Sequence, residues 1–333
     1  MTTTPTPGVT RRRLLTTSAA LVLPASIAFP ARAATWPDKP LRLVVGYPPG
    51  SSPDALARTI ADPLAKVLGQ AVIVDNKAGA AGVIGVDAVA RATDGHTIGL
   101  TGNGPLTTAK ALNPKVPFDV LHDLRPISLV ANSPFVLVGK PSAPARDLAS
   151  FIAYAKAQGD RLSYGSVGLG SGSHLAMEYL KMLTGIKPVH IPFPGFPQVA
   201  TAMFGDQIDM AFVVPSVAAP QQKAGRLRIY AVSSAARSAS FPDLPPVAQV
   251  IGKPEFDVSS WNGVFGPAKM PPEHVARLSR EIAAIVKSEE VRQRLFLQGW
   301  ETAGTNPEAM TRTIEADTAM WGKIIRATGT TSE

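Results

Sequence analysis

Segment 41–68 constrains the fold of this chain more than any other. Its apolar start, Leu41–Val45, predicts a buried β-strand, and leucine and isoleucine then recur at helical spacing. A tight turn, YPPGSSPD, separates the two and ends in a helix start, with Ser52 as N-cap, Pro53 at N1 and Asp54 near the positive end of the dipole. A strand, a loop of small residues and a helix N-terminus in succession form a geometry that holds anions on backbone N–H groups.

The first 33 residues have the pattern of an export signal. A basic region at Arg11–Arg13 precedes an apolar stretch that reaches Phe29, and Ala31–Ala33 supplies an A-x-A cleavage site. The apolar part is short for a membrane span and contains Pro24, so we expect cleavage and a periplasmic protein. The arginines followed by two leucines resemble a twin-arginine signal, and a general secretory signal is the alternative.

Composition excludes several classes of function. Removing residues 1–33 leaves 29 basic and 25 acidic residues, so the formal charge falls from +8 to +4. The remaining basic residues form no run, which disfavours a nucleic-acid partner. Cysteine is absent, and this excludes disulfides, thiol catalysis, cysteine–metal sites and a lipid-anchored N-terminal cysteine. About 300 residues can bury a large core and typically form two domains.

The order of predicted elements indicates two α/β domains. Strands and helices alternate as βαβαβ in the first third of the chain, which predicts a parallel, doubly wound sheet. The same order repeats over 147–232, and the proline-rich stretch 242–254 fits a connection back to the first domain. We therefore expect domain I at 34–135 plus 256–333 and domain II at 136–255. The predicted strands are 41–47, 71–74, 97–101, 127–131, 135–138, 162–166, 189–192, 210–214, 227–232 and 264–265, and the predicted helices are 54–68, 81–92, 147–157, 174–183, 198–204, 273–287, 290–297 and 308–326.

Three loops rich in glycine, serine and threonine follow predicted strands, at 48–54, 101–108 and 165–174. In open α/β sheets, ligands bind at the carboxyl ends of the strands, where such loops gather. None of the loops contains lysine or arginine, so an anion would be held by amides, hydroxyls and helix dipoles. Each hydrogen bond to a charged group contributes about 1.5–3 kcal/mol, whereas micromolar binding needs about 8 kcal/mol. Two loops closing from opposite domains could reach that affinity.

Enzyme motifs are weak in this sequence. There is no phosphate-binding P-loop and no H-E-x-x-H, and the glycines at 168, 170 and 172 have the wrong spacing for a dinucleotide fingerprint. Ser166 and Ser171 lie near His174 in sequence, but without a G-x-S-x-G elbow or an evident orienting carboxylate. His174 could therefore serve as a ligand or loop hydrogen-bonding group, a structural cap or a catalytic base. The other histidines are scattered, so we expect no metal and no cofactor.

Two further residues allow alternative interpretations. Asp54 could stabilise its helix as an acidic first-turn residue, or it could accept a hydrogen bond from a ligand or from ordered water. For Trp261, packing in the core or at a hinge is favoured over a role as a platform on which a ligand stacks.

The chain resembles the Bug-type extracytoplasmic solute receptors, which are the binding proteins of tripartite tricarboxylate transporters. The resemblance covers about residues 36–326, and its motifs are specific in combination. They are WPDKPLRLVVGYPPG at 36–50 with Asp54, LGQ at 68–70, VDNKAG at 74–79, AGVIG at 81–85, DGHT at 94–97, LSYGS at 162–166, GSGSHLA at 170–176, HIPF at 190–193 with Gly195, KAGRLRIYAV at 223–232, FPDLP at 241–245 and SSW at 259–261 with Gly263.

This resemblance implies a type II periplasmic-binding-protein fold, in which two α/β domains joined by a hinge close over a central cleft. It also implies a small carboxylate ligand, gripped partly through backbone amides and bridging waters, and delivery to the large and small membrane subunits of a transporter. The ligand-binding positions expected here are Tyr47, Gly50, Ser51, Ser52 and Asp54 in the first domain, Ser166, Gly170, Ser171, Ser173 and His174 in the second, and Thr101, Asn103 and Val213 toward the rest of the ligand.

The sequence departs from the family pattern at three points. The family often has Phe-Asp-Asn where this chain has FVV at 212–214, lysine where Pro194 stands, and a second glycine in place of Ser51. Losing an aspartate and a lysine makes the distal pocket less polar, so we expect an aromatic or apolar monocarboxylate. We expect a monomeric, non-enzymatic receptor. A ligand sensor for a signalling partner and, less favoured, a hydrolase using Ser171 and His174 are the alternatives.

Overall fold

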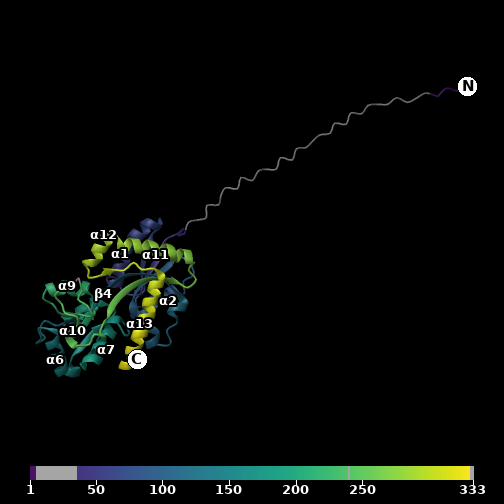
Figure 1. Cartoon of the computed structure of the whole chain (residues 1–333). Helices are drawn as coiled ribbons and strands as arrows, with labels where there is room; N and C mark the ends of the chain where they lie inside the picture. The colour runs from purple at the N-terminus through teal and green to yellow at the C-terminus, as the bar shows by residue number, and fades with distance from the viewer. Residues whose placement is uncertain (5–35, 239–240, 331–333) are drawn as a thin grey trace. The chain divides into compact units, whose positions relative to one another are not determined.

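The computed structural model describes residues 1–4, 36–238 and 241–330. From Trp36 onward the chain forms one compact unit (Figure 1). The predicted export signal falls almost wholly outside the described residues. Within them, no helix is long and apolar enough to cross a membrane.

The compact unit contains two separate sheets. In the first, β1 pairs in parallel with β2 and β3, and β10 lies antiparallel between β3 and β4. The first sheet has the order β11-β4-β10-β3-β1-β2, with β1 at Leu41–Val45, β2 at Val72–Asn76, β3 at Thr97–Gly102, β4 at Leu124–Pro134, β10 at Ser259–Pro267 and β11 at Glu301–Thr302.

The second sheet repeats this plan. Strand β6 is parallel to β7 and β8, and β5 lies antiparallel between β8 and β9. Its order is β7-β6-β8-β5-β9, with β5 at Val136–Gly139, β6 at Ser163–Ser166, β7 at Val189–Pro192, β8 at Met210–Val213 and β9 at Arg228–Val232. Both sheets are therefore mixed, and the prediction of a parallel sheet holds only for β3, β1 and β2 in the first sheet and for β7, β6 and β8 in the second.

Helices cover both sheets, and in Figure 1 α1, α11 and α12 lie together over the first sheet. Leu56, Ile60 and Leu64 of α1 have no solvent exposure and pack in one cluster with Leu41 and Leu43 of β1. This periodic apolar face is the one that the sequence predicts. The helices are α1 (Ser52–Leu68), η1 (Ala80–Gly82), α2 (Val83–Ala90), α3 (Asn103–Thr107), α4 (Ala109–Leu112), α5 (Val120–Asp123), α6 (Leu148–Gln158), η2 (Gly159–Arg161), α7 (Gly172–Thr184), α8 (Phe196–Phe204), α9 (Pro215–Lys223), α10 (Val247–Ile251), α11 (Pro272–Lys287), α12 (Glu289–Phe296) and α13 (Pro307–Thr328).

The chain crosses between the sheets at Phe135 and again between β9 and β10, and Ser233 ties these two crossings together. The Phe135 N–H donates to Ser233 Oγ (2.8 Å), and Ser233 Oγ donates to the Val258 carbonyl (2.6 Å). Backbone bonds reinforce the contact, because the Ser233 N–H donates to the Phe135 carbonyl and the Val258 N–H to the Ser233 carbonyl. The two crossings are therefore bonded to each other, and we refer to them together as the paired hinge.

Four local predictions need correction. Helix α1 begins at Ser52 with Ser51 as its N-cap, because Ser51 has an extended backbone (φ −71°, ψ 162°). The predicted loop 101–108 contains helix α3, and the connection 242–254 contains helix α10. The short strand predicted at 264–265 is part of the nine-residue β10, whose other residues lack an apolar run.

Candidate functional site

A small cavity lies between loops that follow strands of the two sheets. Its volume is about 40 Å³. A water-sized site needs about 10–15 Å³ on this measure, so the cavity accommodates roughly three heavy atoms, which is the size of a carboxylate group. The cavity is lined by Tyr47, Ser51, Ser52, Pro53, Gly102, Asn103, Gly104, Phe135, Val167, Ser171, Gly172, Ser173, Gly195, Phe196, Ser260 and Asn262.

The N-termini of three helices of nine residues or more meet at this cavity, beside the N-cap Gly102 of the five-residue helix α3. Helix α1 contributes its N-cap Ser51, α7 its N-cap Ser171 and α8 its N-cap Gly195. The first turn of a helix carries backbone N–H groups without intrahelical partners and the positive end of the helix dipole. Because α1 covers the first sheet and α7 and α8 the second, an anion in the cavity would be attracted from both sides.

No lysine, arginine, aspartate, glutamate or histidine lines the cavity. The electrostatics of the cavity therefore come from helix dipoles, amides and hydroxyls. Its apolar wall includes Phe135 and Phe196, whose ring centroids lie 6.4 Å apart with an interplanar angle of 56°. The Tyr47 hydroxyl donates to the Ala81 carbonyl (2.7 Å), so that hydroxyl is already engaged within the protein.

Two polar side-chain atoms at the wall are buried and have no hydrogen-bond partner among the described residues. They are Ser51 Oγ and Asn262 Oδ1, and their residues are 3% and 1% exposed. Ser51 is the N-cap of α1, yet its side chain makes no capping bond. Since buried polar groups in folded proteins are nearly always paired, these two atoms indicate a place for a ligand or ordered water.

In the second loop, in contrast, the serine hydroxyls are engaged within the protein. Ser171 Oγ donates to the Gly168 carbonyl (2.7 Å) and accepts from the His174 N–H (3.3 Å). Ser173 Oγ accepts from the Val167 N–H (3.2 Å). These bonds hold the N-terminus of α7 in a fixed geometry against the cavity.

His174 holds the same loop from behind the cavity. Its Nδ1 accepts from the Gly170 N–H (3.0 Å), and its ring stacks on His190 at 4.2 Å. Burial lowers the pKa of His174 to about 4 and that of His190 to about 3, so both rings are neutral at pH 7. The acceptor nitrogen of His174 is therefore occupied by the Gly170 N–H. His190 Nε2 lies 2.7 Å from Ser166 Oγ, away from the cavity wall.

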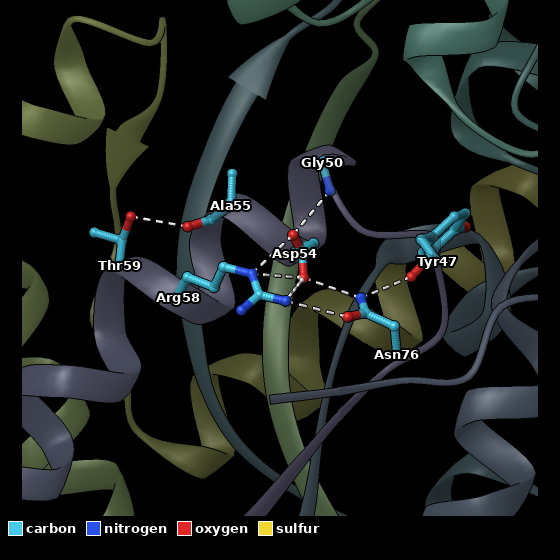
Figure 2. A network of polar contacts seen from close by, with 7 residues as sticks. All are labelled: Tyr47, Gly50, Asp54, Ala55, Arg58, Thr59 and Asn76. Atoms are coloured by element: carbon cyan, nitrogen blue, oxygen red, sulfur yellow. Dashed lines mark hydrogen bonds and ion pairs between the residues drawn. The ribbon is translucent and has the colours of Figure 1, made fainter. Parts of the chain in front are cut away.

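Asp54 organises the first loop, as Figure 2 shows. Its carboxylate accepts from the Gly50 N–H (2.9 Å), from Arg58 Nε (3.0 and 3.1 Å) and from Asn76 Nδ2 (3.0 Å). Asn76 Nδ2 also donates to the Tyr47 carbonyl (3.0 Å). Burial acts to raise the pKa of Asp54, but the bonds from Arg58, Gly50 and Asn76 outweigh it and hold that pKa below its ordinary value. Asp54 therefore fixes the loop and does not line the cavity.

The structure brings some of the predicted ligand-binding residues to the cavity wall and leaves others behind it. Thr101 and Val213 are buried within strands, 1% and 2% exposed. Gly50 (φ +79°) and Gly170 (φ +73°) shape their loops with left-handed backbone. The predicted residues at the wall are Tyr47, Ser51, Ser52, Asn103, Ser171 and Ser173, and those off it are Gly50, Asp54, Thr101, Ser166, Gly170, His174 and Val213.

Sequence reasoning missed several wall residues. Ser260 and Gly195 belong to the motifs quoted for the resemblance, so the signal for them was present. Asn262 alternates with the inward-packed Trp261 on β10, a strand that the sequence predicts only in part. Phe135 lies in a hinge crossing, and nothing local in the sequence marks it as a wall residue.

Comparison with known proteins identifies the family. Residues 56–330 match the family model described as "Tripartite tricarboxylate transporter family receptor". Protein BugT of Bordetella pertussis is 34% identical over 319 residues, which cover 95% of this chain and 98% of BugT.

Two solved structures from Rhodopseudomonas palustris are similar in fold. Rpa4515 with adipate is 30% identical and has a TM-score of 0.85, covering 88% of this chain and 98% of that one. MatC with bound malate is 28% identical and has a TM-score of 0.81, covering 87% and 99%. These comparisons confirm the predicted periplasmic-binding-protein fold. The chain therefore belongs to the tripartite tricarboxylate transporter receptor family and is a solute receptor of the Bug type.

Proposed function

We propose that this receptor captures a small carboxylate in the cavity and that the ligand-binding set is centred on Ser51, Ser52, Asn103, Ser171 and Ser173. The observation that carries the proposal is the convergence of three helix N-termini and the unpaired Ser51 hydroxyl on a cavity without charged side chains. That arrangement favours an anion over a neutral or cationic ligand. The solved relatives Rpa4515 and MatC carry adipate and malate, which supports a carboxylate.

We propose further that the ligand is an aromatic or apolar monocarboxylate. The composition of the cavity wall supports this ligand class. Phe135, Phe196 and Val167 provide apolar surface, and the wall has no basic side chain to pair with a second carboxylate. Val213, on which the sequence argument drew, lies inside β8 and does not reach the wall. A ligand larger than a carboxylate group would fit only if the side chains of Phe135 and Phe196 moved.

Capture would proceed by closure about the paired hinge. Thr108 Oγ1 donates to the Gly170 carbonyl (2.6 Å) and so joins a residue near the first sheet to a loop of the second. A ligand that contacts α1 on one side and α7 and α8 on the other gains these contacts together only in the closed form. It therefore shifts the open–closed equilibrium toward closure.

We infer that the closed, loaded receptor delivers its ligand to the large and small membrane subunits of a tripartite transporter, acting as a monomer. We also infer that residues 1–33 are removed during export by the twin-arginine route. The two domains that close would be 34–135 plus 256–333 and 136–255. A non-enzymatic role is favoured because the nitrogen that His174 would use as a base is bonded to Gly170.

Native mass spectrometry of the protein purified from its own periplasm tests the proposal. We expect a mature chain that begins after Ala33 and carries a trapped small acid. A thermal-shift panel then compares benzoate-like acids with citrate and glutamate. Stabilisation by citrate or glutamate, without stabilisation by benzoate-like acids, would reject the monocarboxylate class. Loss of uptake of the acid when the membrane subunits are deleted separates transport from a sensory role.

A further inference from the structure

A half-buried carboxylate, Asp317 of α13, lies one residue behind the cavity wall. Its Oδ2 accepts from Trp261 Nε1 (2.7 Å), and the Asn103 side chain is its second hydrogen-bond partner. Asn103 lines the cavity, and Trp261 lies between two wall residues of β10, Ser260 and Asn262. Asp317 thus contacts one wall residue directly and is linked through Trp261 to the strand that carries two more.

The Asn103 amide is oriented by these contacts. Its Nδ2 donates to the Ser259 carbonyl (3.2 Å), and the same side chain interacts with Asp317. Its Oδ1 faces the start of α7, where it lies 3.1 Å from the position that a Cβ on Gly172 would occupy. Asp317 therefore helps to hold Asn103 between β10 of the first sheet and the N-terminus of α7, which covers the second sheet.

Asp317 has no ion-pair partner among the described residues. Lys110 of α4 is paired with Asp119, and Glu178 and Lys181 of α7 are paired with each other. The remaining titratable or charged groups on elements packed against α13 are Arg125 of β4, His174 of α7, and Glu273, His274, Arg277, Arg280, Glu281 and Lys287 of α11, and those on α13 itself are Glu308, Arg312, Glu315, Lys323 and Arg326. None of these groups shifts the pKa of Asp317. Burial raises that pKa, and the hydrogen bonds from Trp261 and Asn103 lower it by a smaller amount.

We propose that Asp317 is a positioning residue for Asn103 whose ionisation opposes the bound anion, so that ligand binding is coupled to uptake of a proton. This inference rests on the proposed carboxylate function. When Asp317 is ionised, its charge lies close behind a cavity that must hold another negative charge. At an effective dielectric constant of about 20, the repulsion between two nearby unit charges is enough to change an affinity roughly tenfold.

The sign of the coupling follows from linkage. A bound anion disfavours the ionised form of Asp317, so the carboxyl holds its proton to higher pH in the complex than in the free receptor. Affinity is therefore greatest at low pH and weakens as the pH rises, until Asp317 is ionised in both states. His174 and His190, with pKa values of about 4 and about 3, stay neutral through most of this range.

The test uses formate as the probe, because its three heavy atoms match the cavity, and formamide as the neutral control. Formate affinity of the mature receptor is measured from pH 5 to pH 8 by NMR, which also follows the Trp261 indole N–H without ligand. In the wild type we expect roughly tenfold weaker binding at pH 8 than at pH 5 and an indole shift that titrates above the ordinary range of aspartate. In Asp317→Asn we expect wild-type low-pH affinity at every pH and no indole titration.

Asp317→Asn could instead bind formate more weakly at every pH and keep the wild-type change of affinity with pH. That result would show that Asp317 has only a structural role, and it would overturn the coupling. If Asp317→Asn does not fold, Trp261→Phe removes one hydrogen bond to the carboxylate and must move the pH profile of binding upward, and an unchanged profile rejects the proposal. If formate binds neither protein at any pH, the carboxylate function fails and the coupling fails with it. The ligand-free indole titration separates that result from a failure of Asp317 to titrate.

Discussion

Replacing Ser51 by alanine should weaken ligand binding without weakening the fold. Ser51 Oγ is buried at the cavity wall, makes no capping bond and has no partner among the described residues. Removing it takes away one hydrogen bond to a charged ligand, worth about 1.5–3 kcal/mol, which corresponds to an affinity loss of about 10- to 150-fold. Because no hydrogen bond within the protein is lost, the free energy of unfolding should change by less than about 0.5 kcal/mol.

Ser171→Ala is the matched comparison, since Ser171 is also an N-cap at the wall. Its hydroxyl accepts from the His174 N–H and donates to the Gly168 carbonyl, so its loss should lower the unfolding free energy by about 1 kcal/mol or more. Ser150→Ala in the exposed capping box of α6 controls for the loss of a cap away from the cavity. Calorimetric titration and urea unfolding measure both quantities. If Ser51→Ala destabilises the fold as much as Ser171→Ala, or keeps full affinity, the reasoning is wrong.

Three further predictions concern the hinge, the histidine pair and the closing loop. Ser233→Ala should lower the unfolding free energy by about 1–3 kcal/mol in urea titrations, because both hinge crossings lose a buried partner; a neutral effect would contradict the hinge assignment. Unfolding free energy should fall between pH 6.5 and pH 4, because unfolded histidines take up protons there while buried His174 and His190 do not; urea titrations across that range should not give a constant value. Gly170→Val should weaken calorimetric ligand affinity at least tenfold, since its φ is +73° and an added Cβ would lie 2.1 Å from Leu112 Cδ1; unchanged affinity would show that this loop does not close on the ligand.

Local patterns were sufficient to predict much of the fold. The strand–loop–helix unit at 41–68 is encoded by an apolar run, turn residues and a 3.6-residue period, all within a short segment. The structure confirms its elements and moves the N-cap of the helix by one residue, from Ser52 to Ser51. The antiparallel placement of β10 between β3 and β4 was not predictable in the same way. It depends on pairing between strands more than 100 residues apart, which no local period reports.

In the candidate site, too, the residues with a local sequence signal could be predicted and those placed by long-range packing could not. The small-residue loops were visible in sequence, and Ser51, Ser52, Ser171 and Ser173 do reach the wall. The role of Asp54 was ambiguous in the sequence, because its partner Asn76 is 22 residues away and becomes adjacent only through the pairing of β1 with β2.

Residues brought in by tertiary structure were harder to find. Phe135 depends on the hinge, and Asn262 depends on the alternation of side chains along β10. The contact of Asp317 with Trp261 spans 56 residues and joins the C-terminal helix to a strand of the first sheet. Trp261 belongs to the SSW motif of the resemblance, but nothing in the sequence marks Asp317 as a neighbour of the site.

In the proposed function, helix N-termini, and not basic side chains, select a ligand with a negative charge. Calorimetric titration of the mature protein with benzoate and with benzamide tests it most directly, because the pair differs little in shape and fully in charge. Three helix dipoles at about 1 kcal/mol each predict that the acid binds about 100-fold more tightly than the amide. Equal affinity for benzoate and benzamide, or binding of the amide alone, would contradict the account.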